Sequence, residues 1–164
     1  MKLIPQSVSL AGVLVLAFAI TFICATNKVS ANPTKTVIVD DSATVVLDGA
    51  PIMNWRTITP KSRDNAIVGR TRVNVRLTTA PWVGKIGKIY MLLPPESASS
   101  VKIKWRSQGR LFEGQLTPGG RTLVYAGAIR DARLEDVFDI NIEADGTAIN
   151  SVQRLRFYFE IDVD

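Results

Sequence analysis

The sequence contains no histidine and only one cysteine, Cys24, among its 164 residues. Without histidine the chain has no Ser–His or Cys–His nucleophilic pair and no imidazole ligand for zinc or haem. Cys24 lies in an apolar run near the N-terminus, so the remainder of the chain has no thiol for catalysis, metal binding or disulfide formation. The stability of that remainder must come from packing within the chain or against a partner.

Other signals of catalysis and cofactor binding are weak. Gly84-Lys85-Ile86-Gly87-Lys88 lacks the spacing and the strand-to-helix setting of a phosphate-binding loop. No acidic run has the alternating oxygen ligands of a calcium loop. A glycosidase would need paired carboxylates, but turns, helix ends and exposed strand faces explain the pairs Asp40 and Asp41, Glu135 and Asp136, and Asp162 and Asp164. We therefore expect a protein that is not an enzyme and that binds no metal or cofactor.

An apolar segment near the N-terminus has the features of a secretion signal. Lys2 precedes the apolar residues 8–25, and the small residues of Val29-Ser30-Ala31 follow them. This order predicts a signal peptide of residues 1–31, cleaved between Ala31 and Asn32, and export to the periplasm. The apolar run approaches the length of a membrane-spanning helix, so an uncleaved anchor is the alternative.

The chain that remains after cleavage is predicted to be one mildly basic domain. Residues 32–164 number 133, and the loss of Lys2 and Lys28 lowers the net charge of +5 by two, to +3. The positive residues are spread singly rather than in a dense run, so we expect no nucleic-acid partner. A lipid anchor on Cys24 is a less favoured alternative to cleavage, because the bulky Ile23 precedes the cysteine.

Most of the chain after the leader alternates between apolar and polar residues, which predicts β-strands with one buried face. The alternation is clearest in residues 70–77, 101–106 and 154–164. Residues 86–93 are more apolar throughout than the alternating segments and predict a central strand that is covered on both faces. Only residues 128–137 have helical character. Together with frequent turn signals, these patterns predict an all-β fold, an Ig-like β-sandwich.

Two groups of side chains are candidates for a ligand surface. Trp82 lies in a predicted loop and is a candidate for an exposed aromatic residue that stacks on a glycan, whereas Trp105 faces inward. Core packing is the competing explanation for each tryptophan. The second group predicts a basic patch for acidic glycans or a membrane surface, with a solvated strand face as the competing explanation. It consists of Arg72, Arg76, Lys102, Lys104 and Arg106.

The opening segment, residues 35–49 (KTVIVDDSATVVLDG), has the pattern of one long strand. Its odd-numbered apolar residues would form a buried face, and they include Val37, Val39, Val45 and Leu47. Asp40-Asp41-Ser42 interrupts this row. A strand that begins near a free N-terminus can pair within its own sheet or add to the sheet of a neighbour.

Three segments resemble parts of the pilin subunits of chaperone–usher fimbriae, most closely the disulfide-free major pilins of the CFA/I-like (class 5, α) group. KTVIVDDSATVVLDGAP resembles their N-terminal extension and first strand, and VRLTTAP resembles a strand followed by a small polar loop. MLLPPESASSVKIKWRSQGRLFEGQL resembles their segment of a strand, a proline and a tryptophan-containing strand that turns through glycine.

The resemblance implies an incomplete sandwich that is completed by donor-strand exchange. Residues 32–41 would be the donor extension, with Val37 and Val39 filling the groove of the next subunit. The resemblance also implies a homopolymer of pilin subunits in a cell-surface fimbria that supports adhesion. Its assembly partners would be a periplasmic chaperone and an outer-membrane usher, and its ligand a host glycan or surface receptor. The alternative is a self-contained periplasmic or secreted β-sandwich module that binds a glycan or an envelope partner.

Overall fold

A computed structural model describes residues 35–57, 64–95, 97, 100–147 and 155–163. All of these residues belong to one compact unit, Ala31–Asp164. The predicted cleavage site at Ala31 and Asn32 lies outside the described residues, as does the leader that precedes it. Within the described ranges, no helix is both long enough and apolar enough to span a membrane.

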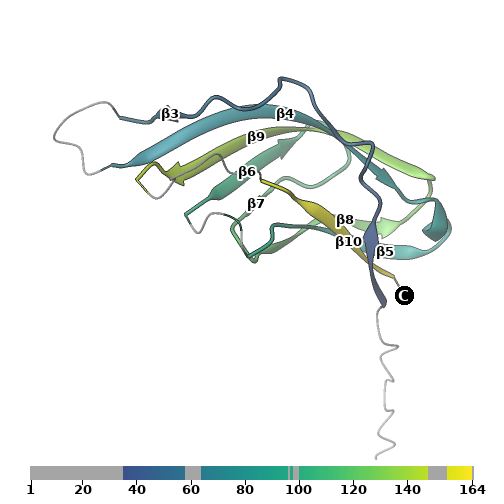
Figure 1. Cartoon of the computed structure of the whole chain (residues 1–164). Helices are drawn as coiled ribbons and strands as arrows, with labels where there is room; N and C mark the ends of the chain where they lie inside the picture. Colours follow the sequence, from purple (N-terminus) through teal and green to yellow (C-terminus); the bar gives the residue numbers. More distant parts are fainter. Residues whose placement is uncertain (1–34, 58–63, 96, 98–99, 148–154, 164) are drawn as a thin grey trace, which may run out of the picture. The chain divides into compact units, whose positions relative to one another are not determined.

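The chain forms two antiparallel sheets, which confirms the predicted all-β sandwich (Figure 1). The strand order is β1-β10-β5-β8 in sheet A and β2-β4-β9-β6-β7 in sheet B, where β3 also pairs with β4. The strands of sheet A are β1 (Lys35–Val39), β10 (Tyr158–Val163), β5 (Ile86–Leu92) and β8 (Arg121–Ala128). Those of sheet B are β2 (Val45–Val46), β3 (Asn54–Trp55), β4 (Ala66–Thr78), β9 (Arg133–Asp145), β6 (Lys102–Ser107) and β7 (Gly114–Leu116). A short 3-10 helix, η1 (Ala80–Trp82), follows β4.

Alternating side chains from both sheets form the core. β4 and β9 pair along 13 residues. Along each strand, every second residue points inward and is buried over most of the pairing. Phe138 of β9 stacks on Trp105 of β6, with the ring centroids 5.8 Å apart. Sheet A contributes Ile89, Phe159 and Ile161 to the same core. The predicted inward position of Trp105 is confirmed, since only 3% of this residue is exposed.

The predicted helix at residues 128–137 and the predicted covering of both faces of residues 86–93 are wrong. Residues 128–137 contain no helix, because they comprise the end of β8, a short connection and the first half of β9. The residues of β9 alternate with a period of two, so Leu134 is buried while the neighbouring Glu135 is exposed. β5 is central in sheet A, as predicted, but only one of its faces is buried, and Ile86 is 63% exposed.

The opening segment forms two short strands in different sheets rather than one long strand. β1 joins sheet A and β2 joins sheet B, and the chain crosses between them at Asp40-Asp41-Ser42. There, the Ser42 N–H donates a hydrogen bond of 3.0 Å to Asp40 Oδ1, and Asp40 bridges to Thr78 of β4. The expected burial of Val45 and Leu47 is wrong, since they are 49% and 48% exposed. The reason is that β2 is a two-residue strand at the edge of sheet B.

Candidate functional site

The edge of sheet A beside the last strand is closed by the first strand of the chain. β1 runs antiparallel to β10, with Lys35 opposite Val163 and Val39 opposite Phe159 (Figure 1). Val39 is 1% exposed, and Val37 packs against the core. In the single chain, the two predicted donor residues therefore pack into their own subunit. Their insertion into a second subunit stays a prediction.

A small cavity lies between the sheets beside this edge. β1 pairs with β10 only as far as Phe159, because the chain then crosses to sheet B. The cavity has a volume of about 160 Å³, and core side chains such as Val73, Met91 and Phe138 line it. Asp41 of the crossing turn lines it as well. The interior is therefore incompletely filled where β1 leaves sheet A.

Polar contacts across sheet A hold β1 on β10. Thr36 Oγ1 donates a hydrogen bond of 2.7 Å to Asp162 Oδ1, and Arg121 Nη2 donates one of 2.8 Å to the same oxygen. The Arg121 guanidinium also lies 3.5 Å from the ring centroid of Tyr90. Burial alone would raise the pKa of Asp162, but the hydrogen bonds from Arg121 and Thr36 outweigh it and hold this pKa below its ordinary value of 3.8. The ionised Asp162 carboxylate thus connects β1 to β10 and β8.

Replacement of Asp162 by asparagine should weaken this connection and reduce the acid sensitivity of the fold. Because the folded-state pKa of Asp162 is below 3.8, its ionised form stabilises the fold above that pH, and the contribution is lost as the pH falls toward the folded-state pKa. At neutral pH the variant should lose about 1 kcal/mol or less of unfolding free energy, the range for ion pairs near the surface, because the amide oxygen of asparagine can still accept both hydrogen bonds. Urea unfolding of both proteins at neutral pH and at about pH 3 measures this. An equal difference between them at both pH values would contradict the assignment.

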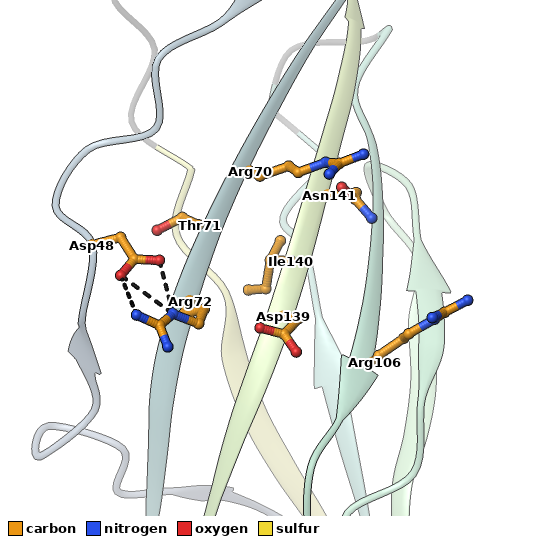
Figure 2. A pocket seen from close by; sticks show the side chains of 8 residues that line it. All are labelled: Asp48, Arg70, Thr71, Arg72, Arg106, Asp139, Ile140 and Asn141. Carbon is orange, nitrogen blue, oxygen red and sulfur yellow. Dashed lines mark hydrogen bonds and ion pairs between the residues drawn. The ribbon is translucent and has the colours of Figure 1, made fainter.

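Ion pairs neutralise two of the predicted basic residues on the outer face of sheet B. Arg72 Nη2 lies 2.9 Å from Asp48 Oδ1, and Arg76 Nε lies 2.8 Å from Glu135 Oε1. The hydrogen bond from Arg72 lowers the pKa of Asp48, and Figure 2 shows this pair. Both pairs are exposed and contribute little to stability. Arg72 and Arg76 are therefore weaker candidates for binding an external anion than the sequence predicts.

Four other cations on this face form no ion pair within the described part of the chain. They are Arg70, Lys102, Lys104 and Arg106. Arg70 of β4 and Lys104 of β6 both lie opposite Asn141 of β9. Figure 2 shows Arg70 beside Asn141, with Arg106 extending outward from β6. Arg70 is absent from the basic patch predicted from the sequence, although it precedes Arg72 and Arg76 in the same alternating row of β4.

The tryptophans do not form a common platform. Trp82 of η1 is half-buried and packs against the core, which favours core packing over a role as an exposed aromatic. A turn, in which the Trp82 N–H donates to the Thr79 carbonyl, folds this loop onto the sandwich. Trp105 is buried, and its Nε1 donates a hydrogen bond of 2.9 Å to the Phe112 carbonyl. Trp55 is 51% exposed but lies on β3, away from η1 in the chain.

The adjacent carboxylates Glu135 and Asp136 lie on opposite faces of β9. Glu135 is exposed and pairs with Arg76, whereas Asp136 is 5% exposed. Asp136 Oδ2 accepts hydrogen bonds from the Leu111 N–H at 2.7 Å and from Ser107 Oγ at 2.8 Å. Because successive side chains of a strand alternate between faces, these two carboxylates do not converge on one substrate position. Asp136 instead fixes the connection between β6 and β7.

No three histidine, cysteine, aspartate or glutamate side chains gather as a metal site in the ranges that the structure describes. Comparisons of the chain with protein-family models, with curated proteins and with solved structures find no match. Two features remain as candidates for function: the β1–β10 edge of sheet A, and the unpaired cations on the outer face of sheet B.

Proposed function

We propose that this chain is a structural subunit of a surface fimbria, polymerised by exchange of β1 between copies. The observation that carries this proposal is the edge beside β10, which is closed only by a five-residue strand from the N-terminal part of the chain. Backbone hydrogen bonds and a row of inward valines specify the pairing, so β1 of a second copy can take the same register on β10. Repeated exchange of this kind generates a homopolymer.

The short connection after β1 supports exchange. Residues 40–44 join β1 to β2, and the Thr44 N–H closes a turn on the Asp41 carbonyl at 2.8 Å. Opening this turn releases β1 without disturbing the long pairing of β4 with β9. The contacts that β1 loses in its own subunit are regained in the next one, so the exchange costs little.

Export and assembly are the remaining parts of the proposal. The predicted signal peptide would direct the chain to the periplasm. Once β1 is released, the edge of β10 and the core residues Phe159 and Ile161 lose their cover, which makes the free subunit prone to aggregation. A periplasmic chaperone would protect this edge until an outer-membrane usher directs the exchange. The polymer at the cell surface would support adhesion.

The second candidate is a self-contained binding module, periplasmic or secreted. The pairing of β1 with β10 of the same chain favours it. In that case β1 remains in place permanently and the protein is a monomer. The two candidates therefore differ in the mobility of β1.

Transfer of β1 to the C-terminus should block polymerisation. Lys35 lies opposite Val163, so residues 35–39 attached after Asp164 through Asn-Gly can form a hairpin with β10 in the same register, with Asp164, Asn and Gly as a three-residue loop. A chain that carries β1 only in this position should stay monomeric, because its acceptor edge is filled and it has no free donor. The chain with β1 at its N-terminus should form concentration-dependent oligomers after unfolding and refolding.

Size-exclusion chromatography with light scattering measures the mass of both proteins. If the chain with the N-terminal β1 stays monomeric at every concentration after refolding, the fimbrial proposal is wrong and the binding module is favoured. Equal oligomerisation of both chains would show that the polymer uses a surface other than the β1–β10 edge.

A further inference from the structure

We propose that the outer face of sheet B binds an acidic polysaccharide at the row formed by Arg70, Asn141 and Lys104. This row crosses three neighbouring strands, β4, β9 and β6, and all three residues are exposed. It lies on the sheet opposite the one that holds the β1–β10 edge. The binding is therefore separate from subunit exchange and does not depend on it.

The charge pattern distinguishes this row from its neighbours. In one flanking row, Asp139 of β9 lies opposite both Arg72 and Arg106. In the other, Glu143 lies opposite Lys102. Of these three rows, only the middle one has an uncharged side chain on β9, because Asn141 lies there between two cations. The positive charge is therefore uncompensated there, and the Asn141 amide supplies further hydrogen-bond donors for an anionic group.

The shape of this face suits an extended ligand. Three shallow depressions, with volumes of about 480, 490 and 390 Å³, share Asn141 as a lining residue. Arg70 lines two of them, and Lys104 also lines two. Along β6 the outward cations recur at every second residue, which spaces them roughly 7 Å apart. A linear polyanion can contact several of these positions at once, and a small ligand cannot.

Two other classes of polyanionic ligand, single-stranded nucleic acids and anionic membranes, suit this face less well. Single-stranded nucleic acids need aromatic side chains on which bases stack, and a peripheral helix or segment on a membrane inserts apolar side chains. None of the exposed large apolar side chains in the described ranges lies on β9 or β6. An acidic polysaccharide needs neither feature. Its carboxylates or sulfates would contact Arg70 and Lys104, and its hydroxyl groups would bond to Asn141.

The test uses the compact unit, residues 31–164, and heparin as a sulfated polysaccharide. Binding is measured by titration calorimetry at an ionic strength of about 0.15 M, where the Debye length is about 8 Å. The double variant Arg70→Gln/Lys104→Gln should bind at least about tenfold more weakly, because two charge-assisted hydrogen bonds are lost. Asn141→Asp should also weaken binding, because it places an acid in the middle row as in the flanking rows. Circular dichroism checks that each variant is folded.

The matched control is Lys85→Gln/Arg130→Gln, which removes the same charge from exposed residues outside sheet B. Its affinity should stay within about twofold of the unaltered protein, since only overall charge changes. An equal loss in the control, or no binding of heparin, would overturn the proposal. The proposal would also be overturned if duplex DNA or phosphatidylserine vesicles bound as tightly as heparin through Arg70 and Lys104.

Discussion

A Val39→Asp protein should lose about 3–5 kcal/mol of unfolding free energy, because the aspartate would be buried without a partner. Val39 is 1% exposed and is the innermost residue of β1. A domain of this size has a total stability of only about 5–15 kcal/mol, so the loss should release β1 or unfold much of the protein. The same change should also prevent β1 from entering a second subunit.

Ile38→Asp is the matched control for this substitution. Ile38 is adjacent in β1 but 68% exposed, so the change should alter stability by no more than about 0.5 kcal/mol. Chemical denaturation measures the stability of both variants, and light scattering measures their assembly after refolding. The contrary outcome is a Val39→Asp protein that forms polymers equal in yield and stability to those of Ile38→Asp. That result would show that β1 does not close the edge of the polymerised subunit.

A Phe138→Ala protein should be destabilised by about 3–5 kcal/mol, the usual cost of truncating a buried phenylalanine. Phe138 is fully buried, stacks on Trp105 and lines the cavity beside the β1–β10 edge. The truncation would enlarge a space that is already incompletely filled, so the cost should lie toward the upper end of that range.

Phe112→Ala provides the comparison, since Phe112 is 43% exposed and bonds to Trp105 only through its backbone carbonyl. This substitution should cost about 1 kcal/mol or less, because little apolar surface is lost from the core. Thermal and urea unfolding compare the two proteins. Equal losses would show that Phe138 does not anchor the packing between the sheets.

Local alternation was sufficient to predict the sandwich where one face of a strand is uniformly apolar. Val73, Val75 and Leu77 of β4 are buried as expected, and so is Trp105 of β6. The inward row at the start of β9, a segment predicted from the sequence to be helical, includes a carboxylate, Asp136, that interrupts the apolar alternation. Hydrogen bonds from the distant segment 107–111 satisfy that carboxylate, and no local pattern in the sequence reveals them.

The pairing of charges was not predictable from the sequence either. Arg72 and Arg76 look equivalent to Lys104 in an alternating pattern, but their partners Asp48 and Glu135 come from other strands or loops. The row of Arg70, Asn141 and Lys104 likewise depends on the register of three strands. The alternation shows which side chains face outward, and only the sheet topology shows which of them are neutralised.

Cysteine cross-linking between copies tests subunit exchange most directly. The compact unit of residues 31–164 has no cysteine of its own, because Cys24 precedes it. Ile38 lies opposite Glu160 in the β1–β10 pair. Opposite residues of antiparallel strands have Cα atoms about 4.5–5.5 Å apart, which is within the range of about 4.4–6.8 Å for a disulfide. One protein carries Ile38→Cys and a second carries Glu160→Cys, so a mixed disulfide in this register forms only between copies.

The two proteins are mixed, unfolded together, refolded and oxidised, and the disulfide-linked peptides are identified by mass spectrometry. A mixture of Ile38→Cys with Lys85→Cys is the control for random collision, since Lys85 is exposed and lies outside the β1–β10 pair. Strand exchange predicts abundant disulfides between positions 38 and 160 of different copies, and few between 38 and 85. The contradictory result is no mixed disulfide above the control, together with a complete intrachain disulfide in a single protein that carries both Ile38→Cys and Glu160→Cys.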